Sequence, residues 1–310
     1  MRAVVFAYSN IGDRCLRVLC ARGVDVVLVV THHDRPGETI WFHRVADTAA
    51  ELDLDFVHAD DPNAPDLIAR VAHASPDVIF AFYYRRLLPQ AILGMASKGA
   101  FNMHGSLLPR YRGRAPTNWA VLNGETQTGA TLHEMIAEPD AGAIVDQSAV
   151  PILPDDTGLQ VMDKVTVAAE QVLWRSLPAI MSGHAPRRPN DLSMGSWYGA
   201  RTPEDGRIDW SQPAARVYDL IRAVAPPYPG AYVEQGKRRL VIASARRLAG
   251  ARRVDLGSVA PGLHVVAERI VGVCGDRGQI EVCRLLVAGV PVDPGALRVL
   301  LRSHAGEATS

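Results

Sequence analysis

Residues 2–31, RAVVFAYSNIGDRCLRVLCARGVDVVLVVT, decide the fold of this chain. Two runs of apolar, β-prone residues, 2–8 and 24–31, flank a helical stretch over residues 12–21. Both runs are apolar throughout, which is typical of strands that are covered on both faces of a parallel sheet. The segment therefore predicts a βαβ unit at the start of the chain.

The same alternation continues beyond this unit. We expect helices over residues 38–52 and 64–74, and short buried strands over residues 56–58 and 77–82. Buried strands that alternate with helices of about 10–15 residues are typical of an α/β fold. The sequence therefore predicts a doubly wound, mostly parallel sheet with a Rossmann-like topology.

The composition changes at residues 190–205, which are rich in Gly, Pro, Ser and charged residues and show no apolar period. This segment is predicted to be a linker between a catalytic domain, 1–189, and a smaller domain, 206–303. Glycine-bearing turns then separate short β-prone pieces, which favours a C-terminal OB-like β-barrel. Its strands are expected at residues 231–234, 239–243, 257–260, 270–274 and 279–286. Residues 304–310 are expected to form a frayed tail.

Bulk properties indicate an intracellular enzyme or binding protein of ordinary composition. Lys and Arg number 33, as do Asp and Glu, so the net charge does not favour a nucleic acid or a membrane as partner. The four cysteines form no CxxC pair, and no His/Cys cluster has metal-ligand spacing, so we expect no metal site. We find no apolar run of ~18 residues and no room for a signal peptide before the first strand. The predicted location is cytoplasmic.

The first turn between strand and helix, YSNIG at residues 8–12, contains one glycine. A dinucleotide site requires the G-x-G-x-x-G pattern, whose glycines let the pyrophosphate approach the backbone, so an NAD site is not expected. A single phosphate could still bind at the N-terminus of the following helix. The alternative is a plain tight turn.

Polar side chains follow the strand that ends near residue 103. Asn102 and His104 are two positions apart, so both project from the same face of an extended segment. The ligand crevice of a parallel α/β sheet lies beyond the carboxyl ends of its strands. The amide and the imidazole are therefore expected to point into that crevice, although a lone histidine there is more often structural.

Two further features follow this pair. Residues 110–119 form a glycine-hinged loop with three arginines, which suits an anionic ligand or is a plain surface loop. A predicted strand over residues 128–135 then leads to Asp140 at an exposed turn. An isolated Asp before Ala-Gly is usually only a turn residue.

Taken together, these segments resemble the folate-dependent formyltransferase superfamily. The likeness rests on FNMHGSLLPRYRGRAP (101–116) and TGATLHEMIAEPDAGAIV (128–145), and two C-terminal segments, 201–210 and 220–231, extend it over almost the whole chain. Its signature is an Asn-x-His pair and an Asp, and here Asp140 lies 36 residues after His104. The resemblance implies an N-formyltransferase that uses 10-formyltetrahydrofolate.

The resemblance also implies roles for individual residues. Asn102 would donate to the oxyanion, His104 would manage the proton, and Asp140 would orient the imidazole and favour its protonated form. The folate would lie along the segment Arg86, Leu87 and Leu88. The turn at Ile136, Ala137, Glu138, Pro139 and Asp140 would close its other side. Arg114 would add a further contact. The relatives carry His at the position of Arg86, which leaves the role of that side chain open.

Within the superfamily the chain resembles the formyltransferases that act on UDP-4-amino-4-deoxy-L-arabinose in lipid A modification and polymyxin resistance. The segments that carry this likeness are VVFAYSNIG (4–12), THHDRPGE (31–38), PDVIFAFYYRRLL (76–88), RGRAPTNWAVLNGET (112–126) and DAGAIV (140–145). The nucleotide sugar is expected to contact two groups of residues: Tyr8, Ser9, Asn10 and Gly12; and Arg201 and Thr202.

The sequence offers three alternatives to this function. Methionyl-tRNA formyltransferases resemble the chain but carry a Lys/Arg-rich insertion after the second strand, whereas Arg35 is the only Lys or Arg within residues 31–38. Nucleic-acid affinity depends on many phosphate contacts, so tRNA is the less favoured acceptor. A non-catalytic folate-binding module is disfavoured, because Asn102, His104 and Asp140 are all present. Another nucleotide-linked amino sugar, such as a thymidine-linked one, is the remaining alternative. The sequence does not decide the oligomeric state.

Overall fold

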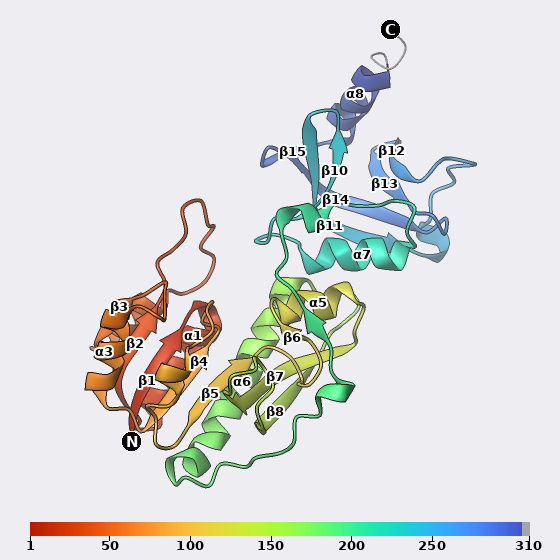
Figure 1. Cartoon of the computed structure of the whole chain (residues 1–310). Coiled ribbons are helices and arrows are strands. Elements are labelled where there is room, and N and C mark those ends of the chain that lie inside the picture. Colours follow the sequence, from red (N-terminus) through yellow and green to blue (C-terminus); the bar gives the residue numbers. More distant parts are fainter. Residues whose placement is uncertain (306–310) are drawn as a thin grey trace. The chain divides into compact units, whose positions relative to one another are not determined.

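The computed structural model describes residues 1–305, with the backbone alone for residues 251 and 302–305. The predicted tail at 304–310 falls mainly outside the described residues, and residues 294–305 form a helix, α8 (Pro294–Ala305), that the sequence analysis does not predict. The chain forms two compact units (Figure 1). The first comprises residues 1–117, 127–151 and 162–200, and the second comprises 118–126, 152–161 and the chain from 201 onward.

The first unit is built on a seven-stranded sheet with the order β3-β2-β1-β4-β5-β7-β8. The strands are β1 (Arg2–Ala7), β2 (Asp25–Thr31), β3 (Phe56–His58), β4 (Val78–Phe82), β5 (Ala100–His104), β7 (Gln127–Glu134) and β8 (Ile144–Pro151). The five strands from β3 to β5 are mutually parallel, whereas β7 and β8 are antiparallel. The prediction of a doubly wound, mostly parallel α/β fold is confirmed.

Helices cover both faces of this sheet. They are α1 (Ser9–Ala21), α2 (Val45–Glu51), α3 (Pro65–Ala74), α4 (Gln90–Leu93) and, from residue 162, α6 (Gly158–Met181), whereas α5 (Pro116–Leu122) falls mainly in the second unit. Side chains alternate along β1, and Val4 and Phe6 join the buried cluster that contains Leu67 of α3. On the other face, a Cβ at Gly12 would lie 2.9 Å from Val45, so this glycine lets α1 and α2 pack closely.

The helix predicted over residues 38–52 begins only at Val45. Polar contacts stabilise the irregular segment before it, because Arg44 Nε donates to Asp34 at 2.6 Å and Glu38 is ion-paired with Arg85. Local helical periodicity was therefore outweighed by ion pairs, one of them to a residue distant in the sequence.

The second unit contains an antiparallel sheet with the order β10-β11-β14-β13-β12, and β15 pairs with β14. Its elements are α7 (Ala214–Ala223), β10 (Ala231–Gln235), β11 (Arg238–Leu248), β12 (Gly262–Val266), β13 (Arg269–Val273), β14 (Gln279–Val287) and β15 (Val290–Val292). Register shifts around Ser244 curl the sheet. The curled sheet confirms the predicted OB-like class. The strand predicted at 257–260 lies instead at β12, after Pro261, which cannot donate a ladder hydrogen bond.

Residues 190–205 contain a short strand, β9 (Trp197–Tyr198), that pairs in parallel with β6 (Arg112–Gly113). The segment that we interpret as a linker therefore contributes backbone hydrogen bonds to the first unit. No helix within residues 1–305 has both the length and the apolar character needed to cross a membrane.

Candidate active site

Asn102 and His104 lie on β5, between the parallel strand β4 and the antiparallel strand β7. His104 is the last residue of β5, and Gly105 begins the turn that follows. A Cβ at Gly105 would lie 1.8 Å from the hydroxyl oxygen of Tyr83, so only glycine allows Tyr83 to pack over this turn. The alternation of a strand thus places the two polar side chains on one face, as predicted.

The pairing of β5 with β7 places His133 opposite Asn102. The amide Nδ2 of Asn102 lies 3.0 Å from His133 Nε2, and His133 Nδ1 lies 2.8 Å from the carbonyl oxygen of Glu134. Because a carbonyl only accepts, Nδ1 donates and Nε2 accepts from Asn102. This bond uses one of the two amide hydrogens of Asn102 and fixes the orientation of the amide.

Asp140 lies between the two histidines. Its Oδ1 is 3.6 Å from both His104 Nδ1 and His133 Nε2, and its Oδ2 accepts the backbone N–H of Gly113 at 2.9 Å. The residue has a φ of 52°, a conformation that Asp tolerates better than most side chains. Asn190 donates to its carbonyl oxygen at 3.0 Å, which secures the turn.

Burial and charge act in opposite directions on this group. Burial lowers the pKa of His104, while Asp140 and the Tyr111 carbonyl, 2.8 Å from Nε2, raise it, and the net pKa lies below its ordinary value. Burial raises the pKa of Asp140, but His104 and the Gly113 N–H lower it by more, so the net pKa lies below its ordinary value and the carboxyl is ionised. Asp140 therefore favours the protonated form of His104, as expected, but desolvation is the larger effect and lowers the net pKa of His104.

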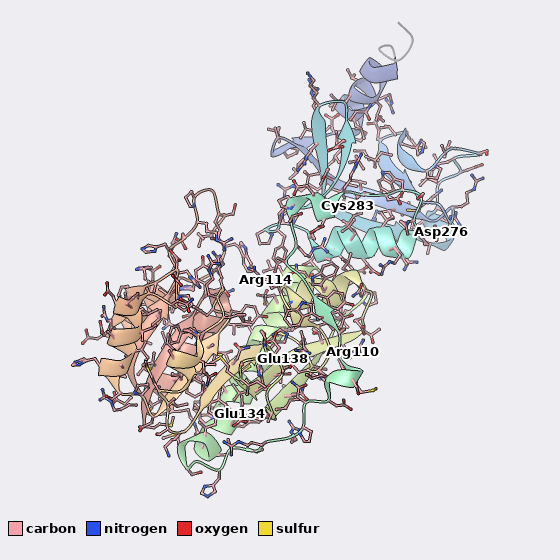
Figure 2. All side chains as sticks on the ribbon, viewed as in Figure 1. Arg110, Arg114, Glu134, Glu138, Asp276 and Cys283 are labelled. Atoms are coloured by element: carbon pink, nitrogen blue, oxygen red, sulfur yellow. The ribbon has the colours of Figure 1, made fainter. Side chains whose placement is uncertain are left out.

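A cavity of about 1020 Å³ opens beside these residues, and Asn102, His104, His133 and Asp140 line it. Every residue predicted to contact the folate also lines it, namely Arg86, Leu87, Leu88, Arg114 and Ile136–Asp140. Figure 2 labels Arg114 and Glu138 among them. The cavity also has apolar, accessible walls, since Leu87 is 71% exposed and Ile136 is 49% exposed. Residues far apart in the sequence thus converge on one site.

Two arginines of the loop at residues 110–119, Arg112 and Arg114, have different surroundings. Arg112 Nη2 donates to Glu138 Oε1 at 2.7 Å and to the carbonyl oxygen of Pro139 at 2.9 Å. Arg114 lines the cavity. Arg112 is therefore engaged inside the protein, where it holds the turn that carries Asp140, and Arg114 is the arginine that can meet an anionic ligand.

The residues at the start of α1 that are predicted to contact the acceptor sugar are not among the residues that line this cavity. Tyr8 is buried beneath Arg85, whose guanidinium carbon is 4.0 Å from the ring centroid. Asn10 accepts the backbone N–H of His43 at 3.0 Å, Gly12 serves close packing, and Ser9 is the first residue of α1 with a φ of 59°. Tyr8, Asn10 and Gly12 thus have structural roles in the first unit.

The remaining acceptor candidates, Arg201 and Thr202, belong to the second unit. Arg201 lies over the ring of Trp119, 4.7 Å from its centroid, and donates to the carbonyl oxygen of Asp205. Thr202 and Asp205 form a capping box at a short 3₁₀ helix (Pro203–Gly206). Local contacts thus account for both residues.

His133 is the site residue that sequence reasoning missed. It lies on a predicted strand, within the motif quoted above, but nothing local marks it as different from other strand residues. Its signal would have been the antiparallel pairing of residues 101–104 with residues 131–134, which single-sequence patterns do not reveal. Among the side chains that the structure describes, no three of His, Cys, Asp or Glu form a group that could hold a metal ion.

Comparison with known proteins places the chain. A model described as formyl transferase matches residues 1–177, and one described as formyl transferase, C-terminal domain, matches residues 201–290. The fold is similar to that of an N-formyltransferase from Helicobacter canadensis in complex with folinic acid and dTDP-3-aminofucose, with 17% identity, 90% of this chain and 98% of that chain covered, and a TM-score of 0.69.

Two further structures are similar. For HypX from Aquifex aeolicus in complex with tetrahydrofolic acid, the identity is 21%, 92% of this chain and 44% of that chain are covered, and the TM-score is 0.63. For a 4-N formyltransferase from Francisella tularensis, the identity is 20%, 78% of this chain and 96% of that chain are covered, and the TM-score is 0.63. Since the family model spans more than half of the chain, and the Asn-x-His pair and Asp140 meet at one cavity, the chain belongs to the formyl transferase family.

Proposed function

We propose that this chain transfers the formyl group of 10-formyltetrahydrofolate to the amine of a nucleotide-linked amino sugar. The observation that carries the proposal is the meeting of Asn102, His104 and Asp140 at one large cavity. An amide that can donate, a buried neutral imidazole and an ionised carboxylate are the groups that formyl transfer to an amine requires.

The residues would divide the chemistry as follows. His104 would accept the proton that the amine loses as its nitrogen bonds to the formyl carbon, and would return it to N10 as the bond from N10 to carbon breaks. Asn102 would donate its second amide hydrogen to the negative charge that develops on the formyl oxygen. Asp140 would stabilise the protonated imidazole during transfer, which its 3.6 Å separation from Nδ1 permits.

The volume and the lining of the cavity support a site for the formyl donor. Its volume of about 1020 Å³ is at the upper end of the range of small-molecule sites. The apolar side chains of Leu87 and Ile136 provide contact area for flat rings, and the segments 86–88 and 136–140 supply backbone donors and acceptors. We assign the folate to these two segments.

For the acceptor we propose UDP-4-amino-4-deoxy-L-arabinose, and with it a cytoplasmic role in lipid A modification and polymyxin resistance. Support comes from the sequence likeness to formyltransferases of that class and from the absence of a Lys/Arg-rich segment between β2 and α2. A thymidine-linked amino sugar is the second candidate, because the H. canadensis protein carries dTDP-3-aminofucose. We also propose that the catalytic domain comprises residues 1–189 and the OB-like domain residues 206–303.

The test is a comparison of acceptors. The purified chain is given 10-formyltetrahydrofolate with UDP-4-amino-4-deoxy-L-arabinose, with dTDP-linked 3-amino or 4-amino sugars, or with charged initiator tRNA, and release of tetrahydrofolate is followed. We expect kcat/KM to be highest with the UDP sugar, and a His104→Ala variant gives the background. Turnover with tRNA alone would contradict the sugar assignment.

A further inference from the structure

A buried histidine outside the catalytic group connects two parts of the first unit. His32 follows β2, and its side chain is 3% exposed. Its Nδ1 lies 3.1 Å from Asp60 Oδ1, and its Nε2 lies 3.0 Å from the backbone nitrogen of Arg85. The ring stacks on Tyr84 with centroids 4.0 Å apart. The imidazole therefore joins the end of β3 to the segment that follows β4.

These contacts fix the tautomer of His32. The backbone N–H of Arg85 can only donate, so Nε2 must carry a lone pair. The hydrogen is then on Nδ1, where it donates to the carboxylate of Asp60. Burial lowers the pKa of His32, and Asp60 partly opposes this, so the neutral form that this bond needs is favoured. Both ring nitrogens are thus engaged in a single arrangement.

The segment that His32 holds needs an external support. Tyr83 has a φ of 58°, in the left-handed region that is costly for a bulky side chain. The following residues, 84–88, form no helix or strand and line the cavity. Tyr84 is held by a bond from its hydroxyl to the carbonyl oxygen of Ala59 at 2.7 Å. The hydrogen bond from the backbone N–H of Arg85 to His32 holds the backbone of this segment, as the Tyr84 hydroxyl bond holds the side chain.

We propose that His32 is a positioning residue for the formyl donor, which sets the backbone of residues 85–88 against the folate through its Nε2. This inference rests on the proposed function, since it assigns the folate to that segment. His32 itself is buried behind the segment and acts through Arg85. Asp60, whose other oxygen is 3.1 Å from His33 Nδ1, orients the imidazole.

Three substitutions separate the positioning bond from simple packing. His32→Gln places an amide oxygen near the position of Nε2 and can accept from Arg85. His32→Asn places its amide near Nδ1, so it keeps a partner for Asp60 but loses the bond to Arg85. His32→Phe keeps the stacking on Tyr84 and loses both bonds. The readouts are the Kd for tetrahydrofolate by calorimetry, and the KM for each substrate and kcat in the complete reaction.

We expect His32→Asn and His32→Phe to weaken the binding of tetrahydrofolate and to raise the KM for the formyl donor, each by about tenfold, the effect of one lost hydrogen bond. In both variants the KM for the acceptor and kcat at saturating folate stay within about twofold of wild type. His32→Gln is expected to restore most of the folate affinity. If His32→Phe unfolds in a thermal scan, the comparison of Gln with Asn carries the test, and if His32→Asn unfolds, the comparison of Gln with Phe does.

Equal folate affinity of the Gln and Asn variants would overturn the inference, as would a fall in kcat without a change in the KM for the formyl donor. The proposed function fails differently. If the wild-type chain binds no tetrahydrofolate, the folate assignment is wrong and this inference falls with it. If folate binds and these variants have wild-type affinity, only the inference is wrong.

Discussion

The amide nitrogen of Asn102 lies 3.0 Å from Nε2 of His133, across the antiparallel pair of β5 and β7. His133 Nδ1 donates to its neighbour's carbonyl, so Nε2 is the ring nitrogen that accepts from the amide. The amide of Asn102 is therefore held with its oxygen turned away from His133. The orientation of the Asn102 amide therefore depends on the pairing of β5 with β7.

Loss of that bond should reduce the rate of the chemical step. In His133→Phe the amide of Asn102 is free to rotate, and we expect kcat to fall by about 10- to 100-fold while the KM for each substrate changes little. His133→Gln, whose amide oxygen can take the place of Nε2, is the matched control and should recover part of the loss. Steady-state kinetics with both substrates check this. Identical rates for the two variants would argue against an orienting bond.

Removal of the Asn102 amide itself should cost more. We expect Asn102→Ala to lower kcat by about 10²- to 10³-fold, because the developing charge on the formyl oxygen loses a donor. Tetrahydrofolate affinity, measured by calorimetry, should stay close to wild type. A variant that loses affinity but retains kcat would place Asn102 in binding rather than in catalysis.

The acid limb of the pH profile should report His104. Its pKa lies below the ordinary value, so the neutral imidazole needed to accept a proton persists to lower pH than a free histidine would allow. Asp140 raises this pKa, so in Asp140→Asn the acid limb of kcat/KM should move to still lower pH, in addition to a lower rate. Titration of the acceptor amine contributes a limb that the substitution leaves in place. A shift to higher pH would contradict the assignment.

The turn after His104 should tolerate no side chain at Gly105. Alanine there would bring its Cβ to 1.8 Å from the hydroxyl oxygen of Tyr83 and 2.9 Å from its ring, so the ring must move. We expect Gly105→Ala to destabilise the chain by about 1–3 kcal/mol, measured by urea unfolding. Gly199→Ala, where a Cβ meets nothing within 4 Å, is the control and should change stability by less than about 0.5 kcal/mol. Equal stabilities would mean that Tyr83 moves aside at little cost.

The fold was largely readable because its strands are buried on both faces and their apolar runs are local. The runs at residues 2–8 and 24–31 became β1 and β2 with small changes at their ends. The helix expected from residue 38 failed over its first residues, because Glu38 is paired with Arg85 rather than placed in a helical turn. Periodicity reports local preference and is blind to such a partner.

The sequence by itself determined the class of the sheet, the pair of Asn102 and His104 on one face, and the family to which they belong. Strand alternation is a local property, and a motif is read along the chain. Only the tertiary structure decided that His133 orients Asn102, that Arg112 holds the turn of Asp140, and that burial keeps His104 neutral. These outcomes depend on strand pairing and desolvation, which arise only when distant segments pack together and exclude water.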